Sequence, residues 1–349
     1  MATRKSIFII YSLILFLIGT IFSMPGIMFG YYLGNYNKIV FNSSYYYTPN
    51  NVSTIENFFL NSDLGEVKIK YVYPQSQNIE YCVMINVKIE IAGQTLGNRQ
   101  FTDFFIINWD NESIPLSFTL LVKPNVSLTE FFTLLKNCLI TVYLRADIVF
   151  DISTSIKDGD VDVSIPYNVR VNSIKLNISN GNIKYNLIGC YIEGNLTGFN
   201  KEGDIELSGL NMKFSNSSSM KFSLKKGDLD LYINQYEMMG ANVSCIAEID
   251  NGKLGFYYDD SSGDIGARFE IPFGTHTSYD LPECIISLYI DCVLNGFHFD
   301  QPNLDLVHEY EDSFVFTSMD LYENRAINNY NMTFFLIQGI FDMSLESVG

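Results

Sequence analysis

The sequence is poor in the residues and motifs on which most enzymes depend. Charged residues make up 17% of the chain, and there is one tryptophan. Its three histidines, His276, His298 and His308, lack the close spacing that metal sites use. No Gly-x-Ser-x-Gly elbow, phosphate loop or dinucleotide fingerprint is present. The sequence therefore predicts no catalytic residue, no metal site and no cofactor.

Cysteines are few, and none forms a Cys-x-x-Cys pair. The six are Cys82, Cys138, Cys190, Cys245, Cys284 and Cys292. Cys284 and Cys292 are the preferred candidates for a local disulfide, which an extracellular location would allow. Cys245 falls on an inward position of the pattern described below, so a buried free thiol is at least as well supported for it.

Positive charge is scarce relative to negative charge. The formal net charge is −17 and the sequence pI is about 4.5. A phosphate backbone would be repelled, so nucleic acid is excluded as a partner. The same charge favours solubility and permits diffuse binding of divalent cations or contact with basic surfaces.

Charge is absent altogether from residues 6–37, and residues 7–29 are almost wholly apolar. Such a stretch is long enough to cross a membrane as a helix, and Arg4 and Lys5 just before it place the N-terminus inside. A small-x-small cleavage site is not evident, which favours an uncleaved anchor over a removed signal. We therefore expect a cytoplasmic N-terminus over 1–5, a single transmembrane anchor over 6–34 and a body outside the cell membrane.

A turn recurs through the middle of the chain, and it consists of Gly followed by Asp, Asn or Lys. Its glycines are 22, 22, 24 and 25 residues apart: Gly159, Gly181, Gly203, Gly227 and Gly252. A repeat of this length is typical of stacked architectures. Glycine suits the turn because it adopts positive φ without steric cost.

Apolar residues alternate on both sides of each turn. The second unit has Ile174, Leu176 and Ile178 before its glycine, and Ile183, Tyr185 and Leu187 after it. The first arm of the third unit is degenerate, with Leu196, Gly198 and Asn200. A period of two predicts strands with one buried face. This pattern predicts a mainly β body, either a β-solenoid or a ladder of antiparallel hairpins.

These serial Gly-Asp turns with Ile, Val or Leu alternation resemble the putative-adhesin family of bacterial and archaeal surface proteins. The resemblance covers about residues 150–270 and reaches more weakly back to about residue 60, where Gly65 repeats the template. It implies a β-solenoid-like fold and a cell-surface role, with no catalytic residues to carry over. The segment 72–150 departs from the simple repeat.

The rest of the chain is divided by composition. Residues 35–57 are rich in Asn, Ser and Tyr and are interpreted as a stalk linker. Residues 58–150 form a β-rich part of the body with one short helix near 128–137, because Ser127 to Glu130 is a capping-box pattern. Residues 151–270 form the repeat region, and residues 271–349 a β-rich cap that closes the end of the stack.

Polar motifs agree with an extracellular body. Nine Asn-x-Ser/Thr triplets are candidate glycosylation sites: Asn42, Asn51, Asn111, Asn125, Asn177, Asn195, Asn216, Asn242 and Asn331. Asp158, Asp160 and Asp162 begin like a calcium loop but lack the glycine and glutamate that a helix-loop-helix site requires. A looser calcium site between turns, or simple solvation, remains open for them and for Asp259, Asp260 and Asp264.

These observations predict a membrane-anchored extracytoplasmic β-repeat glycoprotein with a structural, adhesion or interaction role at the cell surface. The alternative is a glycan-binding or polysaccharide-cleaving protein on the same scaffold, since paired carboxylates on a solenoid face can cleave glycosidic bonds. The expected partners are the membrane, through the N-terminal helix, and surface proteins or glycans. The sequence leaves the oligomeric state open.

Overall fold

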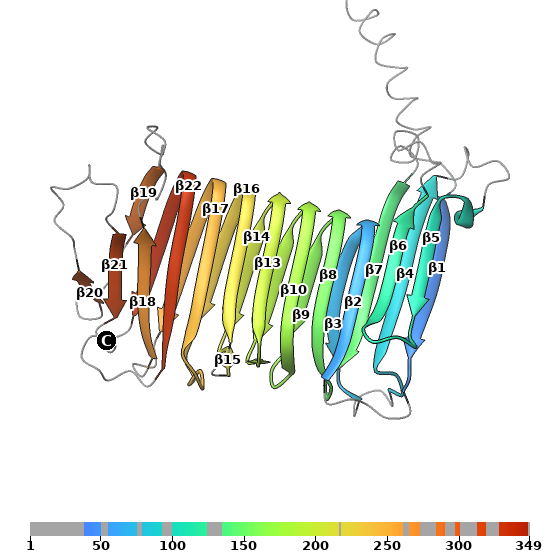
Figure 1. The fold of residues 1–349 in the computed structure, drawn as a ribbon, viewed down its shortest axis with the longest axis horizontal. Helices are drawn as coiled ribbons and strands as arrows, with labels where there is room; N and C mark the ends of the chain where they lie inside the picture. Colours follow the sequence, from blue (N-terminus) through green and yellow to red (C-terminus); the bar gives the residue numbers. More distant parts are fainter. Residues whose placement is uncertain are drawn as a thin grey trace, which may run out of the picture.

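A computed structural model describes residues 38–49, 55–74, 79–92, 100–123, 135–215, 218–260, 265–272, 284–289, 297–300, 313–318 and 328–347. The described part of the chain is mainly β-strand, as predicted. The strands lie side by side along the long axis of the molecule, from β1 at one end to β18–β21 at the other (Figure 1).

The body is built from rungs, each with a first arm, a glycine corner and a second arm. Four rungs have separate strands for their arms: β2 (Ile55–Leu64) and β3 (Glu66–Val72), β8 (Val149–Asp158) and β9 (Val161–Ile165), β10 (Arg170–Asn180) and β11 (Ile183–Ile188), and β13 (Asn195–Glu202) and β14 (Ile205–Leu210). Three rungs are single long strands that include the corner: β16 (Ser219–Asn234), β17 (Val243–Asp260) and β22 (Asn328–Ser347).

Neighbouring rungs pair arm to arm in parallel. Along the first arms, Ile174 of β10 is in register with Ile152 of β8 on one side and Leu196 of β13 on the other. The second arms pair in the same way from β3 through β22. Parallel register between equivalent arms is the arrangement of a stacked solenoid, whereas a ladder of antiparallel hairpins would pair its arms antiparallel.

The glycine corners stack directly on one another. The amide of Gly181 donates to the carbonyl oxygen of Glu202 on the next rung at 2.9 Å, and Gly203 donates to Lys226 at 3.0 Å. The φ angles of Gly181 and Gly203 are +130° and +121°. A Cβ on Gly203 would collide with the carbonyl oxygen of Gly181. The corner therefore needs glycine for its backbone angle and also for the close approach of its neighbour.

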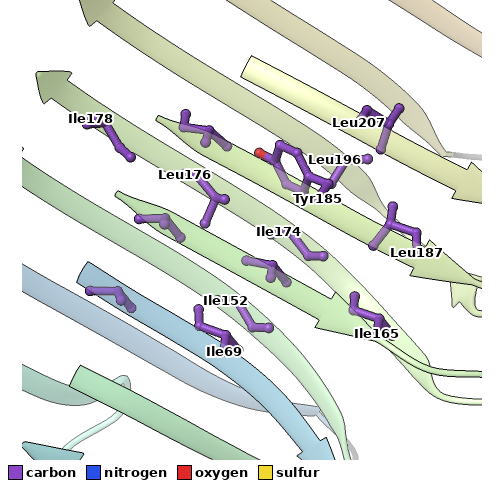
Figure 2. Close-up of a cluster of buried hydrophobic side chains, with 14 of the residues drawn as sticks. Ile69, Ile152, Ile165, Ile174, Leu176, Ile178, Tyr185, Leu187, Leu196 and Leu207 are labelled. Atoms are coloured by element: carbon purple, nitrogen blue, oxygen red, sulfur yellow. The ribbon is translucent and has the colours of Figure 1, made fainter. Parts of the chain in front are cut away.

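The apolar residues of both arms form one interior that runs through successive rungs. Figure 2 shows Ile174, Leu176 and Ile178 of the first arm with Tyr185 and Leu187 of the second. All five are at most 1% exposed. Each fully buried side chain of this size stabilises the fold by roughly 1.5–3 kcal/mol.

The degenerate third unit keeps the same register and fills its interior in another way. Leu196 and Asn200 face inward and are fully buried. A Cβ on Gly198 would lie 3.1 Å from the hydroxyl oxygen of Tyr185, so the missing side chain leaves room for that ring. The side-chain amide nitrogen of Asn200 (Nδ2) donates to the backbone carbonyl oxygen of Gly181 at 2.6 Å. The two residues that break the apolar pattern therefore have separate roles: Gly198 leaves room for the Tyr185 ring, and Asn200 hydrogen-bonds to the glycine corner.

The repeat extends beyond residues 151–270 in both directions. Gly65, with φ +111°, lies against Gly159, and a Cβ on Gly159 would collide with the carbonyl oxygen of Gly65. At the other end, Gly339 of β22 is in register with Gly252 of β17. The C-terminal strand β22 thus continues the stack beside β17, although the two glycines are far apart in the sequence.

The C-terminal rung is inserted out of sequence order. β22 pairs in parallel with β17 on one side and with β18 (Ile265–Pro272) and β19 (Cys284–Tyr289) on the other. β21 (Ser313–Ser318) and β20 (Phe297–Asp300) continue antiparallel from β18. The predicted cap therefore contributes a full rung as well as the strands at the end of the stack.

At the opposite end, one more parallel strand extends each row of arms, and antiparallel strands follow it. β7 (Leu135–Arg145) pairs in parallel with β3, and β4 (Val83–Ala92) and β1 (Lys38–Tyr47) follow it antiparallel. In the other row, β6 (Leu116–Val122) pairs in parallel with β2, and β5 (Phe105–Asp110) follows it antiparallel. A short 3-10 turn, η2 (Phe101–Asp103), precedes β5.

Two expectations for this end differ from the structure. The segment 35–57, interpreted as a stalk, contains β1 and the start of β2, because its Tyr-rich stretch pairs with β4. The helix expected near 128–137 is wrong for residues 135–137, which begin β7 and pair with β4. Pairing with a neighbouring strand outweighs the local capping signal there, and residues 128–134 lie outside the described residues.

The predicted anchor, residues 6–34, lies outside the described residues. Within the described residues, the structure contains no helix that is both long enough and apolar enough to cross a membrane.

Replacing one corner glycine tests the stack. In the Gly203→Ala variant of the full chain, the new Cβ meets the Gly181 carbonyl oxygen at a positive φ, so the free energy of unfolding should fall by at least about 2 kcal/mol. Urea denaturation followed by circular dichroism measures it. Lys201→Ala, an exposed position before the same corner, should change it by less than about 0.5 kcal/mol. Equal stability of the two variants would contradict the stacked corner.

Candidate binding edge

The stack has two long edges of different character. One edge carries the glycine corners, and the other is where each second arm ends and the chain turns toward the next rung. Short strands mark this second edge, β12 (Tyr191–Ile192) and β15 (Lys213–Phe214), and the label of β15 locates it in Figure 1. The glycine edge is lined by polar residues, whereas the second edge carries tyrosines.

We call five residues on successive rungs the tyrosine edge: Tyr73, Tyr167, Tyr191, Lys213 and Tyr236. Tyr73 follows β3 and Tyr167 follows β9, while Tyr191 and Lys213 open the short strands after β11 and β14. Tyr236 follows β16. The four tyrosines are 37–46% exposed, whereas other aromatic side chains of the described residues, such as Tyr185 and Phe222, are fully buried.

The tyrosines of this edge are held in place. The Tyr73 hydroxyl donates to the backbone carbonyl of Tyr167 at 2.7 Å. The ring of Tyr167 covers Gly189, where a Cβ would collide with it. At the far end, the Tyr236 hydroxyl donates to the Asp259 carboxylate at 2.8 Å. These exposed rings are therefore pre-organised, which lowers the entropy cost of binding through them.

Charges on this edge are paired across rungs. The Lys213 ammonium lies 3.0 Å from the Glu237 carboxylate, and Arg170 forms an ion pair with Glu193. The hydrogen bond to Glu237 raises the pKa of Lys213 above its ordinary value. The same ammonium lies 5.7 Å from the ring centroid of Tyr167 and 5.2 Å from that of Tyr191. Both distances suit cation–π contacts.

The opposite, glycine edge is occupied by a hydrogen-bond ladder. The side-chain oxygen of Asp160 accepts from the backbone amide of Asn182 at 2.7 Å. In the same way, the side chain of Asn182 accepts from the backbone amide of Asp204, and the side chain of Asp204 from that of Asp228, both at 2.9 Å. The carboxylate of Asp158 accepts from the Asn180 side chain. Asp158 and Asp160, two of the residues considered for a looser calcium site, therefore serve the turns. Of the others, Asp162 accepts from the Ser164 hydroxyl and Asp259 from the Tyr236 hydroxyl.

In the described part of the chain, no group of three or more His, Cys, Asp or Glu side chains is placed to hold a metal ion. Asp264, His276 and His308 lie outside it. The side chains of Asp260 and His298 are not described either.

One carboxylate on the outer face of the second arms is perturbed. Burial raises the pKa of Asp230 above its ordinary value, and the nearby Asp228, Asp204 and Glu206 add to the shift, while Lys253 opposes it. Its side chain lies over Gly255 of the next rung, where a Cβ would collide with a carboxylate oxygen. A single perturbed carboxylate among like charges is a local electrostatic cost and not an acid–base pair.

The described cysteines are buried free thiols: Cys82, Cys138, Cys190 and Cys245. Cys245 is fully buried on an inward position of β17, and burial raises its pKa to about 12. A thiol with that pKa is unreactive at neutral pH. Cys292 lies outside the described residues, so its pairing with Cys284 stays a prediction.

Five glycosylation candidates are exposed: Asn42, Asn111, Asn177, Asn195 and Asn242. Asn331 is half-buried on β22, and Asn51, Asn125 and Asn216 lie outside the described residues. Occupancy of these sites stays a prediction.

The tyrosine edge was not predicted from the sequence. Tyr167, Tyr191, Lys213 and Tyr236 are 24, 22 and 23 residues apart, close to the spacing of the corner glycines, but they lie beyond the apolar alternation of the arms and one of them is a lysine. The available signal was a tyrosine shortly after the apolar alternation of an arm, as in Pro166-Tyr167-Asn168. That signal is weak in a chain with 23 tyrosines.

Comparisons with known proteins add little. No family model and no curated protein matches the chain. One similar solved structure is described as a "putative cell adhesion protein" from Clostridium sporogenes ATCC 15579, with 11% identity, a TM-score of 0.34 and coverage of 88% of this chain and 100% of that chain. Another is a "putative adhesin" from Bacteroides fragilis NCTC 9343, with 9% identity, a TM-score of 0.34 and coverage of 88% and 98%. A TM-score of 0.34 is too low to support a conclusion about this chain.

The perturbed carboxylate generates a pH-dependent prediction. Because folding raises the pKa of Asp230, the native state binds the proton more tightly, and stability falls as pH rises from the unfolded pKa of about 3.9 through the folded value. Asp230→Asn should therefore be more stable than the unchanged protein at pH 7, and this gain should shrink at pH 3.

Urea denaturation at both pH values measures the difference. Asp250→Asn, an exposed carboxylate near the glycine edge, is the matched control and should show little change at either pH. A stability gain for Asp230→Asn that is larger at pH 3 than at pH 7 would show that the sign of the shift is wrong.

Proposed function

We propose that this chain is a membrane-anchored surface protein whose stacked β body holds a contact surface away from the membrane. The body has a structural, adhesive or interaction role outside the cell. The observation that carries the proposal is the tyrosine edge: four exposed rings on one side of a continuous stack, three of which are fixed by a hydrogen bond or by packing on Gly189. Exposed, rigid aromatic side chains are typical of binding surfaces.

The membrane and the extracellular location rest on the sequence. The uncharged segment 6–34 follows Arg4 and Lys5, and five exposed asparagines of the described body lie in glycosylation triplets. Single-pass anchoring with the N-terminus inside is part of the proposal.

The proposed function does not include catalysis. Polysaccharide cleavage by two carboxylates would require a protonated acid beside an ionised partner, with a substrate site between them. Burial raises the pKa of Asp230, and the carboxylates near it, Asp228, Asp204 and Glu206, carry the same charge and add to the shift. If Asp230→Asn abolished turnover of a polysaccharide by the purified chain, the enzymatic alternative would replace this proposal.

The location is tested by protease treatment of intact cells that express the full chain with a C-terminal epitope. The epitope should disappear from intact cells, and an N-terminal fragment of about the anchor's size should survive. A chain lacking residues 6–34 should stay inside and keep its epitope. Full protection of the unchanged protein on intact cells would refute the extracytoplasmic location.

A further inference from the structure

The chemistry of the tyrosine edge restricts what it can bind. Its basic groups are each paired with a carboxylate, Lys213 with Glu237 and Arg170 with Glu193, and Asp259 adds one further carboxylate beside Tyr236, so the edge carries little net charge although the whole chain carries −17. A polyanion would be repelled by the molecule as a whole, and a polycation would find little local excess of carboxylates on this edge. The paired groups still offer hydrogen-bond donors and acceptors beside the rings. A neutral, hydroxyl-rich ligand fits this combination.

The geometry of the edge favours an extended ligand. Adjacent strands of a sheet are about 4.8 Å apart, so side chains in register on successive rungs form a row with that step, and the Lys213 ammonium of this row contacts the rings of both Tyr167 and Tyr191. Tyr191 is in register with Lys213 on the next rung and with Arg170 on the previous one. A linear chain of sugar rings could lie along this row, with C–H faces on the tyrosines and hydroxyls near the ion pairs.

A protein partner fits the edge less well. The stable core of a protein interface is a contiguous apolar patch from which charges are depleted. Here charged residues stand between the rings, because Lys213 occupies the rung between Tyr191 and Tyr236. Ring faces that alternate with hydrogen-bonding groups suit a ligand that alternates in the same way.

We infer that the tyrosine edge is a binding site for a neutral polysaccharide, which lies along the stack with its sugar rings packed on Tyr167 and Tyr191. This inference rests on the proposed surface function and names the ligand class for it. The ion pairs Arg170–Glu193 and Lys213–Glu237 orient the hydroxyl groups of the sugar. Binding requires no metal and no covalent step.

The experiment is isothermal titration of the full chain in detergent micelles with three neutral hexasaccharides, of β-1,4-linked glucose, β-1,4-linked N-acetylglucosamine and α-1,6-linked mannose. At least one should bind, and heparin should not. Tyr191→Ala should weaken that binding about tenfold or more, because a rigid contact face is lost. Tyr191→Phe keeps the ring and should bind within about threefold of the unchanged protein.

The matched control is Tyr232→Ala. Tyr232 is 46% exposed but lies within β16, on the face of the second arms and not on the edge. It should leave the affinity unchanged. Tyr167→Leu is the second variant on the tyrosine edge. It keeps an apolar side chain over Gly189 and should also weaken binding. An unfolding curve followed by circular dichroism verifies that each variant is folded.

Absence of binding to all three hexasaccharides would overturn the inference, and so would equal loss of binding in Tyr232→Ala and Tyr191→Ala. Preferential binding of heparin would also overturn it, since the edge would then recognise anions. These failures are separable from failure of the proposed function, because protease accessibility on intact cells does not depend on the ligand.

Discussion

The close approach of one glycine corner to the next is the constraint on which the rest of the structure depends. Each corner amide donates to the backbone of the following rung, and the space where a Cβ would stand is filled by the carbonyl of the preceding glycine. Once the corners stack, both arms of every rung are placed in parallel register with their neighbours. Register then decides which side chains share an inward column, because a shift of one residue would reverse the faces of a whole arm.

The interior tolerates variation because the corners hold the register. The rung of β13 and β14 has Gly198 and Asn200 where its neighbours have apolar side chains, and Tyr185 from the rung before occupies the space that Gly198 leaves. A similar exchange occurs on the second arms, where a Cβ on Gly209 would meet the side chain of Met212. Volume is conserved locally while the sequence pattern is lost, which is how packed interiors accommodate substitution.

The sequence predicted what is local and periodic. The spacing of five glycines and the alternation around them indicated a stacked β body, and the inward position of Cys245 follows from the same pattern. The rung that carries Gly339 was missed because it is inserted next to β17 from far along the chain. Residues 135–137 were expected to be helical because a capping motif is local, whereas the pairing of β7 with β4 is not. The tyrosine edge was missed because its residues lie beyond the apolar alternation of the arms and one of them is a lysine, although the last four recur every 22 to 24 residues.

Function follows from the two edges that this arrangement creates. Polar side chains of the glycine edge are used within the stack, for example in the bonds that join Asp160, Asn182 and Asp204. The loops of the other edge do not have to meet the same steric condition, so they can carry exposed rings. A scaffold that fixes its surface rungs at a regular step is suited to an extended ligand.

The most direct test of the stacked register is disulfide trapping between rungs. Ser208 and Tyr232 are partners on adjacent rungs, with Cα atoms expected about 4.8 Å apart, whereas Asn186 lies one rung further from Tyr232 at about twice that distance. A disulfide requires Cα atoms within about 7 Å. The double variant Ser208→Cys with Tyr232→Cys should therefore cross-link under mild oxidation, as detected by mass spectrometry of its peptides. Asn186→Cys with Tyr232→Cys should not, and cross-linking of the second pair in preference to the first would contradict the account.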